Sequence, residues 1–198
     1  MKKKRIDYDE LLHIQTRGRD DEKADAFHHP YEPTPYRVLE RLADCGLIQK
    51  EDVLIDFGCG KGRVDFFMNK ICHCKTIGVE YDERMYDLAI KNAKGANNQD
   101  VSFCLQQAES YEIPQTSNRF YFFNPFSIEI LYTVLDHILA SYYEHPRTLY
   151  LFFYYPSDDY IAHLMMHDGF TFYDEIECGD LFEGNNIRER IMIFTIDC

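Results

Sequence analysis

The chain contains the glycine turn Gly58-Cys59-Gly60-Lys61-Gly62 directly after the apolar run Val53–Phe57. A short apolar run closed by glycine is typical of a strand that is buried on both faces. Apolar residues from Phe66 to Ile71 then predict a helix. A strand, a tight turn and a helix in this order form part of a βαβ unit, so the sequence favours folds with a parallel sheet.

The same alternation continues along the chain. Further helices are predicted where apolar residues recur at helical spacing, at 35–46, 83–96, 128–143 and 158–167. Further strands are predicted at 76–80, 101–105, 120–123, 149–154, 170–176 and 191–196. No helix separates the last two strands, so we expect them to pair antiparallel at one edge of a mainly parallel sheet.

Two carboxylates near the glycine turn indicate a nucleoside ligand. Glu80 ends the next predicted strand, where a carboxylate binds ribose hydroxyls in nucleotide-binding folds. Asp56 comes two residues before Gly58, where it would repel a pyrophosphate but attract an ammonium group. A dinucleotide site would also need glycine at position 63, which is Arg63. The pattern therefore favours S-adenosylmethionine over NAD.

Three segments, 53–63, 78–82 and 124–126, resemble motifs of class I S-adenosylmethionine-dependent methyltransferases. The similarity in order and spacing extends over roughly residues 30–196. It implies an α/β fold, doubly wound, with a mainly parallel seven-stranded Rossmann-like sheet whose last strand is antiparallel. It also implies methyl transfer to a nitrogen or oxygen nucleophile of an unidentified acceptor, which could be a protein side chain, a small molecule or a nucleobase.

The resemblance also implies which residues bind S-adenosylmethionine. They are Asp56, Gly58, Cys59, Gly60, Gly62, Glu80, Tyr81, Gln107, Ala108 and Asn124. Asp56, Gly58 and Gly60 would surround the methionine part, and Glu80 would bind the ribose. After the third strand, either Gln107 or Glu109 would contact the adenine.

The segment Asn124-Pro125-Phe126 follows the fourth predicted strand, at the edge where open parallel sheets bind ligands. It resembles the (Asn/Asp/Ser)-Pro-Pro-aromatic motif of enzymes that methylate amino nitrogens, but it lacks the second proline. The resemblance makes Asn124, Pro125 and Phe126 candidate catalytic residues. A merely structural Asn-Pro turn is the alternative interpretation.

Residues 1–34 are polar and show no regular pattern, so we expect an N-terminal extension, partly flexible, that could cover the cofactor site. Residues 35–198 would form the methyltransferase domain. Candidate acceptor-binding residues come from the end of this extension and from the carboxyl edge of the sheet: Tyr31, Thr34, Tyr36, Phe126 and Tyr155.

The net charge of −13 disfavours nucleic acid as a partner, because phosphate backbones are attracted by basic surfaces. The sequence contains no apolar run long enough to span a bilayer, and no apolar segment follows Lys2–Arg5, so we expect a cytoplasmic protein without a membrane partner. No metal site is predicted, because Cys72-His73-Cys74 has no second ligand pair. The oligomeric state is left open.

Two other functions compete with methyl transfer. One is a non-catalytic S-adenosylmethionine-binding module that acts through protein partners, which Asn124-Pro125 disfavours. The other is an NAD-dependent oxidoreductase, which Arg63 and Asp56 disfavour. The sequence therefore favours an S-adenosylmethionine-dependent methyltransferase.

Overall fold

A single sheet forms the centre of the computed structural model, which describes residues 6–96, 98–184 and 186–197. Within the described residues, seven strands form this sheet, in the order β3-β2-β1-β4-β5-β7-β6. They are β1 (Val53–Phe57), β2 (Lys75–Glu80), β3 (Val101–Leu105), β4 (Arg119–Phe122), β5 (Leu149–Tyr154), β6 (Thr171–Glu177) and β7 (Arg190–Ile196). β1 to β5 are parallel, and β7 lies antiparallel between β5 and β6. The predicted fold class is confirmed.

The strand order reverses between β1 and β4. From β1 the chain adds β2 and β3 on one side and then crosses back to place β4 on the other side. The carboxyl ends of β1 and β4 therefore lie next to each other without a connecting helix between them, which opens a crevice for a ligand.

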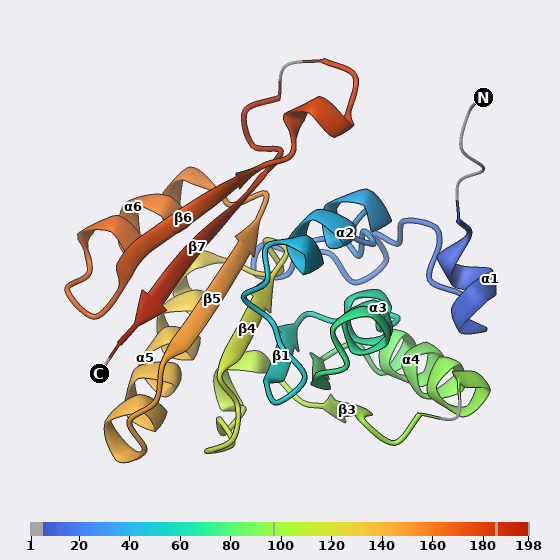
Figure 1. The fold of residues 1–198 in the computed structure, drawn as a ribbon, viewed down its shortest axis with the longest axis horizontal. Helices are drawn as coiled ribbons and strands as arrows, with labels where there is room; N and C mark the ends of the chain where they lie inside the picture. The colour runs from blue at the N-terminus through green and yellow to red at the C-terminus, as the bar shows by residue number, and fades with distance from the viewer. Residues whose placement is uncertain (1–5, 97, 185, 198) are drawn as a thin grey trace.

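Helices cover both faces of the sheet (Figure 1). One face carries α2 (Tyr36–Asp44), α3 (Arg63–Cys72) and α4 (Glu83–Ala96), and the other carries α5 (Ile128–Glu144) and α6 (Asp158–Met166). Successive residues of β1 serve the two faces: Ile55 packs in the cluster that contains α5, and Leu54 in the cluster that contains α3. This is why β1 is a continuous apolar run, interrupted only by Asp56.

The predicted helices and strands from residue 35 onward are confirmed, with their ends within three residues of the observed ones. The N-terminal extension differs from the expectation of irregular chain, because it contains the helix α1 (Tyr8–Leu12). Asp7 caps this helix, and Tyr8 packs on the rings of Tyr36 and Phe67 at centroid distances of 5.0 and 4.9 Å. A helix of 5 residues is too short to show an apolar period, so tertiary contacts define it.

Among the described residues, no helix combines the length and the apolar character that crossing a membrane requires.

Candidate active site

The glycine turn lies at the carboxyl end of β1, against the end of β4. Gly58, Gly60 and Gly62 all have positive φ angles, of 75°, 55° and 83°, and α3 begins at Arg63. A Cβ atom on Gly58 would lie 2.6 Å from Cβ of Pro125, so only glycine allows this approach. The turn thereby brings the backbone of residues 58–62 next to the Asn124-Pro125-Phe126 segment, as expected for one combined site.

Glu80 lies at the carboxyl end of β2 and its carboxylate faces the turn. Its Oε2 accepts a hydrogen bond from the backbone N–H of Gly60 at 2.8 Å, and its Oε1 accepts from those of Tyr81 and Asp82, both at 2.9 Å. Burial raises the pKa of Glu80, and these three backbone donors act in the opposite direction. The carboxylate is therefore fixed in position before any ligand binds.

A pocket, here called the Glu80 pocket, opens beside this carboxylate. Its walls come from the glycine turn, from the carboxyl ends of β2, β3 and β4, and from the N-terminal extension. Of the predicted site residues it includes Tyr31, Gly58, Glu80, Tyr81, Ala108, Pro125 and Phe126. Gln106 and Glu109 line it after β3, whereas Gln107 does not.

A second depression, the Asn124 hollow, lies beside the first. It is lined by Arg19, His29, Pro30, Glu32, Phe123, Asn124 and Tyr155, and it shares Pro30, Glu32 and Phe123 with the Glu80 pocket. The structure therefore separates the two ends of the predicted catalytic motif. Asn124 faces the second hollow, while Phe126 lies on the wall of the first and is only 4% exposed.

Two residues of the Asn124 hollow have unusual backbone geometry. Asn124 follows β4 with a φ angle of 41°, and Tyr155 follows β5 with a φ angle of 52°. Neither is glycine, so both conformations are unfavourable and must be held by their surroundings. Oδ1 of Asn124 is buried and accepts no hydrogen bond from any group in the described part of the chain. A buried acceptor without a donor is uncommon and requires an explanation.

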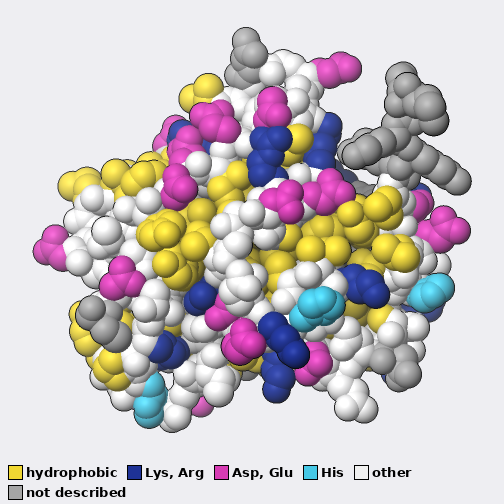
Figure 2. All heavy atoms as spheres, in the orientation of Figure 1, with side chains coloured by type: hydrophobic (Ala, Val, Ile, Leu, Met, Phe, Trp, Pro, Cys, Tyr) yellow, Lys and Arg dark blue, Asp and Glu magenta, His cyan; other side chains and the backbone are white. Residues whose placement is uncertain are grey.

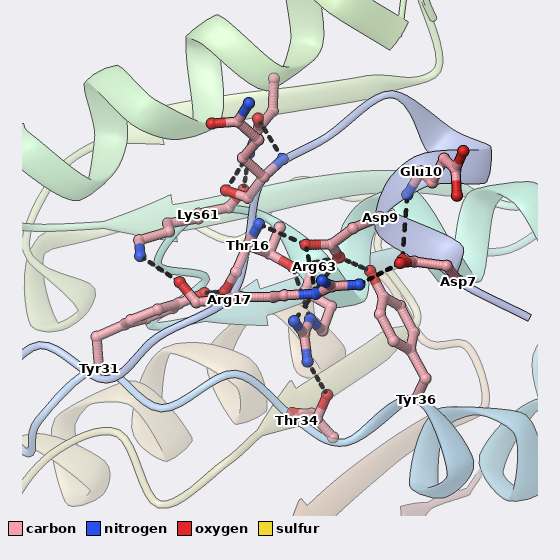
Figure 3. Close-up of polar contacts among 12 residues, drawn as sticks. Asp7, Asp9, Glu10, Thr16, Arg17, Tyr31, Thr34, Tyr36, Lys61 and Arg63 are labelled. Carbon is pink, nitrogen blue, oxygen red and sulfur yellow. Dashed lines mark hydrogen bonds and ion pairs between the residues drawn. The ribbon is translucent and has the colours of Figure 1, made fainter. Parts of the chain in front are cut away.

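The N-terminal strap, defined as residues 16–31, forms one wall of the Glu80 pocket. Figure 3 shows its residues Thr16, Arg17 and Tyr31 near Lys61 and Arg63. The Tyr31 ring covers Gly60, where a Cβ atom would lie 2.2 Å from it, and its hydroxyl donates to the carbonyl of Thr16 at 2.6 Å. His28 stacks on Tyr81 with ring centroids 3.9 Å apart. The strap therefore covers both the glycine turn and the residue after Glu80.

Arg63 connects the strap to the helix behind the turn. It is 8% exposed, and its guanidinium donates to Oγ1 of Thr16 at 2.7 Å and to the carbonyl of Thr34 at 3.2 Å. It also lies over the Tyr36 ring, 4.4 Å from the centroid, and Tyr36 donates to Asp9. Thr34 and Tyr36, two of the predicted acceptor-binding residues, therefore belong to this buried network and line neither the pocket nor the hollow.

Three predicted cofactor residues lie deeper than the pocket wall. Asp56 and Cys59 are 3% and 5% exposed, and the Phe103 ring packs against Gly62. Asp56 lies beside the carboxyl group of Asp65, a residue of α3 that sequence analysis did not single out. Burial raises the pKa of both carboxyl groups.

The described residues contain no group of three or more His, Cys, Asp or Glu side chains arranged to bind a metal ion.

The chain is similar to known methyltransferases in sequence. A family model described as a methyltransferase domain matches residues 54–145. A protein-lysine N-methyltransferase of Saccharolobus islandicus is 33% identical over 66 residues, which are 33% of this chain and 41% of that protein. The present chain thus aligns with less than half of that relative.

Solved structures share the fold at low sequence identity. An RNA methyltransferase of Salinibacter ruber in complex with S-adenosyl-L-homocysteine matches with a TM-score of 0.56 and 20% identity, over 84% of this chain and 94% of that one. A dimethyladenosine transferase of Plasmodium falciparum matches with a TM-score of 0.59 and 14% identity, over 84% of this chain and 63% of that one.

Proposed function

We propose that this chain, which matches a methyltransferase-domain model over residues 54–145 and shares the fold of class I S-adenosylmethionine-dependent methyltransferases, methylates an amine nitrogen, and that the amine is a lysine side chain of a protein. S-adenosylmethionine is the methyl donor of this family. The observation that carries the acceptor site is the buried, unpaired Oδ1 of Asn124. This oxygen can only accept a hydrogen bond, so it matches a nucleophile that bears an N–H or O–H group. The choice of nitrogen is supported by the matching relative named as a protein-lysine N-methyltransferase.

The Glu80 pocket is the proposed cofactor site, and its residues fit the chemistry of that group. The carboxylate of Glu80 accepts from three backbone donors and has one lone pair left, on Oε2, to accept from a ribose hydroxyl. Gly58 presents backbone without a side chain to the pocket, and Asp56 supplies negative charge behind the turn. When bound, S-adenosylmethionine supplies a methyl group on a positively charged sulfur.

The residues shared by the two hollows mark where transfer would occur. Pro30, Glu32 and Phe123 line both, so an acceptor in the Asn124 hollow and a donor in the Glu80 pocket would meet there. Asn124 would orient the amine by accepting a hydrogen bond from one of its N–H groups. The lone pair of the nitrogen would then be directed away from Asn124. The exposed carboxylate of Glu32 could take the proton that the amine releases.

The chemistry of the adjoining surface supports a cationic acceptor. From the Asn124 hollow, a groove continues over the rings of Phe123, Tyr154, Tyr155 and Phe182. The carboxylates of Glu32 and Glu189 border it, and the positive charge of Arg19 is offset by Asp21 and Glu32. Aromatic faces beside carboxylates bind the aliphatic stem and the ammonium of lysine. The matching relative named as a protein-lysine N-methyltransferase supports the same class of acceptor.

The charge of the whole molecule agrees with this acceptor. The chain carries a net charge of −13, and on the face drawn in Figure 2 the Lys and Arg side chains lie in small groups beside acidic ones. Such a surface attracts lysine-rich proteins and repels RNA.

The proposal is tested by incubating the protein with S-adenosylmethionine labelled in its methyl group and with three acceptors in parallel: a lysine-rich protein, the same protein with its amines acetylated, and total RNA. We expect label in the unmodified protein and production of S-adenosylhomocysteine. Label in RNA alone would contradict the acceptor. Binding of S-adenosylmethionine without turnover on any acceptor would instead favour a non-catalytic binding module.

A further inference from the structure

Two carboxyl groups lie against each other behind the glycine turn. Asp56 is the fourth residue of β1 and Asp65 lies in the first turn of α3, which packs on that strand. Asp56 is 3% exposed and Asp65 is completely buried. Each of these carboxyl groups shifts the pKa of the other, so the two side chains lie close together. Carboxyl groups are seldom buried unless a cation or several donors compensate them, so this pair requires an explanation.

The surroundings supply no such compensation. Asp56 is flanked in the sheet by Gly78 of β2 and Tyr121 of β4, and the hydroxyl of Tyr121 pairs with that of Thr34. The other ionisable groups that interact with the pair are the Glu80 carboxylate, the Tyr121 hydroxyl and the thiols of Cys59 and Cys74, none of which is a cation. No N–H or hydroxyl donor in the described part of the chain reaches either oxygen of Asp65.

Two buried carboxylates in contact cannot both be ionised at neutral pH without a cation. Burial raises the pKa of Asp56 to about 7, although the hydrogen bond from Asp65 lowers it. Burial, followed by the negative charge of Asp56, raises the pKa of Asp65 further above its usual range. Asp65 is the more deeply buried of the two, and no donor in the described part of the chain reaches its oxygens, so the proton that the pair must retain resides on Asp65 and Asp56 is the group that ionises.

We propose that Asp65 is a positioning residue for the cofactor: its carboxyl group stays protonated and donates a hydrogen bond that holds Asp56 as a single buried negative charge facing the ammonium of the methionine part. This proposal rests on the proposed function, because it requires S-adenosylmethionine in the Glu80 pocket. Below pH 7, binding of the ammonium displaces the proton of Asp56 to solvent, and the proton of Asp65 remains in the hydrogen bond between the two carboxyl groups.

Two substitutions of Asp65 differ in whether they keep its hydrogen-bond donor. Asp65→Asn keeps a neutral donor of the same shape, so Asp56 ionises as before. Asp65→Leu removes the donor and leaves the Asp56 carboxylate with no hydrogen bond from α3, so its pKa rises and its charge is lost near neutral pH. Only ligands that carry an ammonium should respond to this loss. Adenosine lacks the ammonium and serves as the matched control ligand.

The experiment measures the affinity of the full chain for S-adenosylhomocysteine and for adenosine by calorimetry, from pH 5.5 to pH 8.5. At pH 7 we expect Asp65→Asn to bind S-adenosylhomocysteine within threefold of the wild type, and Asp65→Leu to bind it at least tenfold more weakly. Both variants should bind adenosine within threefold. At pH 6, titrations in buffers of different ionisation enthalpy should show release of about one proton on binding to the wild type, because Asp56 is then protonated before the ligand arrives.

Equal losses for the two ligands in Asp65→Leu would overturn the proposal, since a packing defect would act on both. Weak binding by Asp65→Asn would also overturn it, because Asp65 would then have to act as a second negative charge. If Asp65→Leu does not fold, Asp65→Ala removes the same donor. Its loss of affinity for S-adenosylhomocysteine is then compared with its loss for adenosine in the same way. If the wild type binds neither ligand, the proposed function itself is refuted. If the wild type binds S-adenosylhomocysteine and transfers methyl groups from S-adenosylmethionine, the proposed function holds, and the Asp65 variants then test the role of Asp65 alone.

Discussion

At the scale of single residues, cofactor binding should depend most on Glu80, because three backbone N–H donors fix its carboxylate beside the glycine turn. Glu80 follows its strand at the spacing that nucleotide-binding folds use, and the structure has its carboxylate in the pocket wall. Asp65 could not be singled out, because an aspartate within a helical segment usually faces solvent. Only the packing of α3 on the sheet reveals that it is completely buried beside Asp56. The sequence likewise did not indicate that Thr34 and Tyr36, predicted as acceptor-binding residues, lie in a buried network where their polar atoms bond to Tyr121, Asp9 and Arg63.

Substitution of Glu80 should weaken cofactor binding strongly. Glu80→Ala removes the acceptor for a ribose hydroxyl and frees the Gly60 backbone N–H. We expect a loss of about 1.5–3 kcal/mol in the binding free energy of S-adenosylhomocysteine, the range for hydrogen bonds to a charged group. Calorimetry measures this, with Glu51→Ala as a control because Glu51 is exposed outside both hollows. Unchanged affinity in folded Glu80→Ala would contradict the ribose assignment.

The carboxyl pair should also affect stability as a function of pH. The pKa of Asp65 is raised in the folded state, so its contribution to stability is fully present below its unfolded pKa and is lost as pH rises toward the folded pKa. Asp65→Asn lacks this loss. Its free energy of unfolding relative to the wild type should therefore increase from pH 5 to pH 8, by at most about 1.4 kcal/mol per pH unit. Urea denaturation at several pH values measures the difference, and a constant difference would contradict the raised pKa.

At the scale of elements, strands and long helices were predictable because each buries a periodic apolar face. β2 was expected at 76–80 and spans Lys75–Glu80, and α5 was expected at 128–143 and spans Ile128–Glu144. The strap and α1 were not predictable, because they are fixed by contacts with α3 and α4 rather than by an internal pattern. Arg84 of α4 illustrates this, because its guanidinium forms ion pairs with Asp20 and Glu22 of the strap and with Asp82, which directly precedes α4.

Loosening the strap should speed cofactor exchange. Arg84→Ala removes the ion pairs to Asp20 and Glu22, so the strap should open more often. Partly exposed ion pairs contribute about 0.2–1 kcal/mol, so we expect association and dissociation rates to rise by up to about fivefold with little change in affinity. Surface plasmon resonance with S-adenosylhomocysteine measures both rates. Lys91→Ala, which removes a charge from the same helix without a strap contact, should behave like the wild type, and equal rates in all three proteins would show that the strap does not control access.

At the scale of the whole molecule, the acidic charge and the sheet topology together define what reaches the site. The topology sets both hollows at the carboxyl edge near the switch between β1 and β4. The fold class and the position of this edge followed from the alternation of strands and helices. The separation of Asn124 from Phe126 did not, because it depends on the left-handed backbone of Asn124. The charge makes the rate of encounter with an acceptor sensitive to salt.

Salt should slow the methylation of a basic acceptor. With a net charge of −13, the chain attracts a lysine-rich protein over a distance that added salt shortens. Raising the NaCl concentration from about 50 to about 300 mM should lower kcat/KM several-fold for such a protein and leave it nearly unchanged for a short neutral peptide with one lysine. Initial rates of label incorporation give both values. A kcat/KM that rises with salt for the basic protein would indicate that electrostatic attraction does not guide the acceptor.

The most direct test of the account compares the wild type with Asn124→Ala in one assay. Label transferred from S-adenosylmethionine to a lysine-rich protein is followed at saturating cofactor, and cofactor affinity is measured on the same samples. If Asn124 orients the amine, turnover should fall by a factor on the order of 100, while cofactor affinity stays within about threefold. Full turnover by Asn124→Ala would contradict the account, because the unpaired oxygen would then have no part in positioning the acceptor.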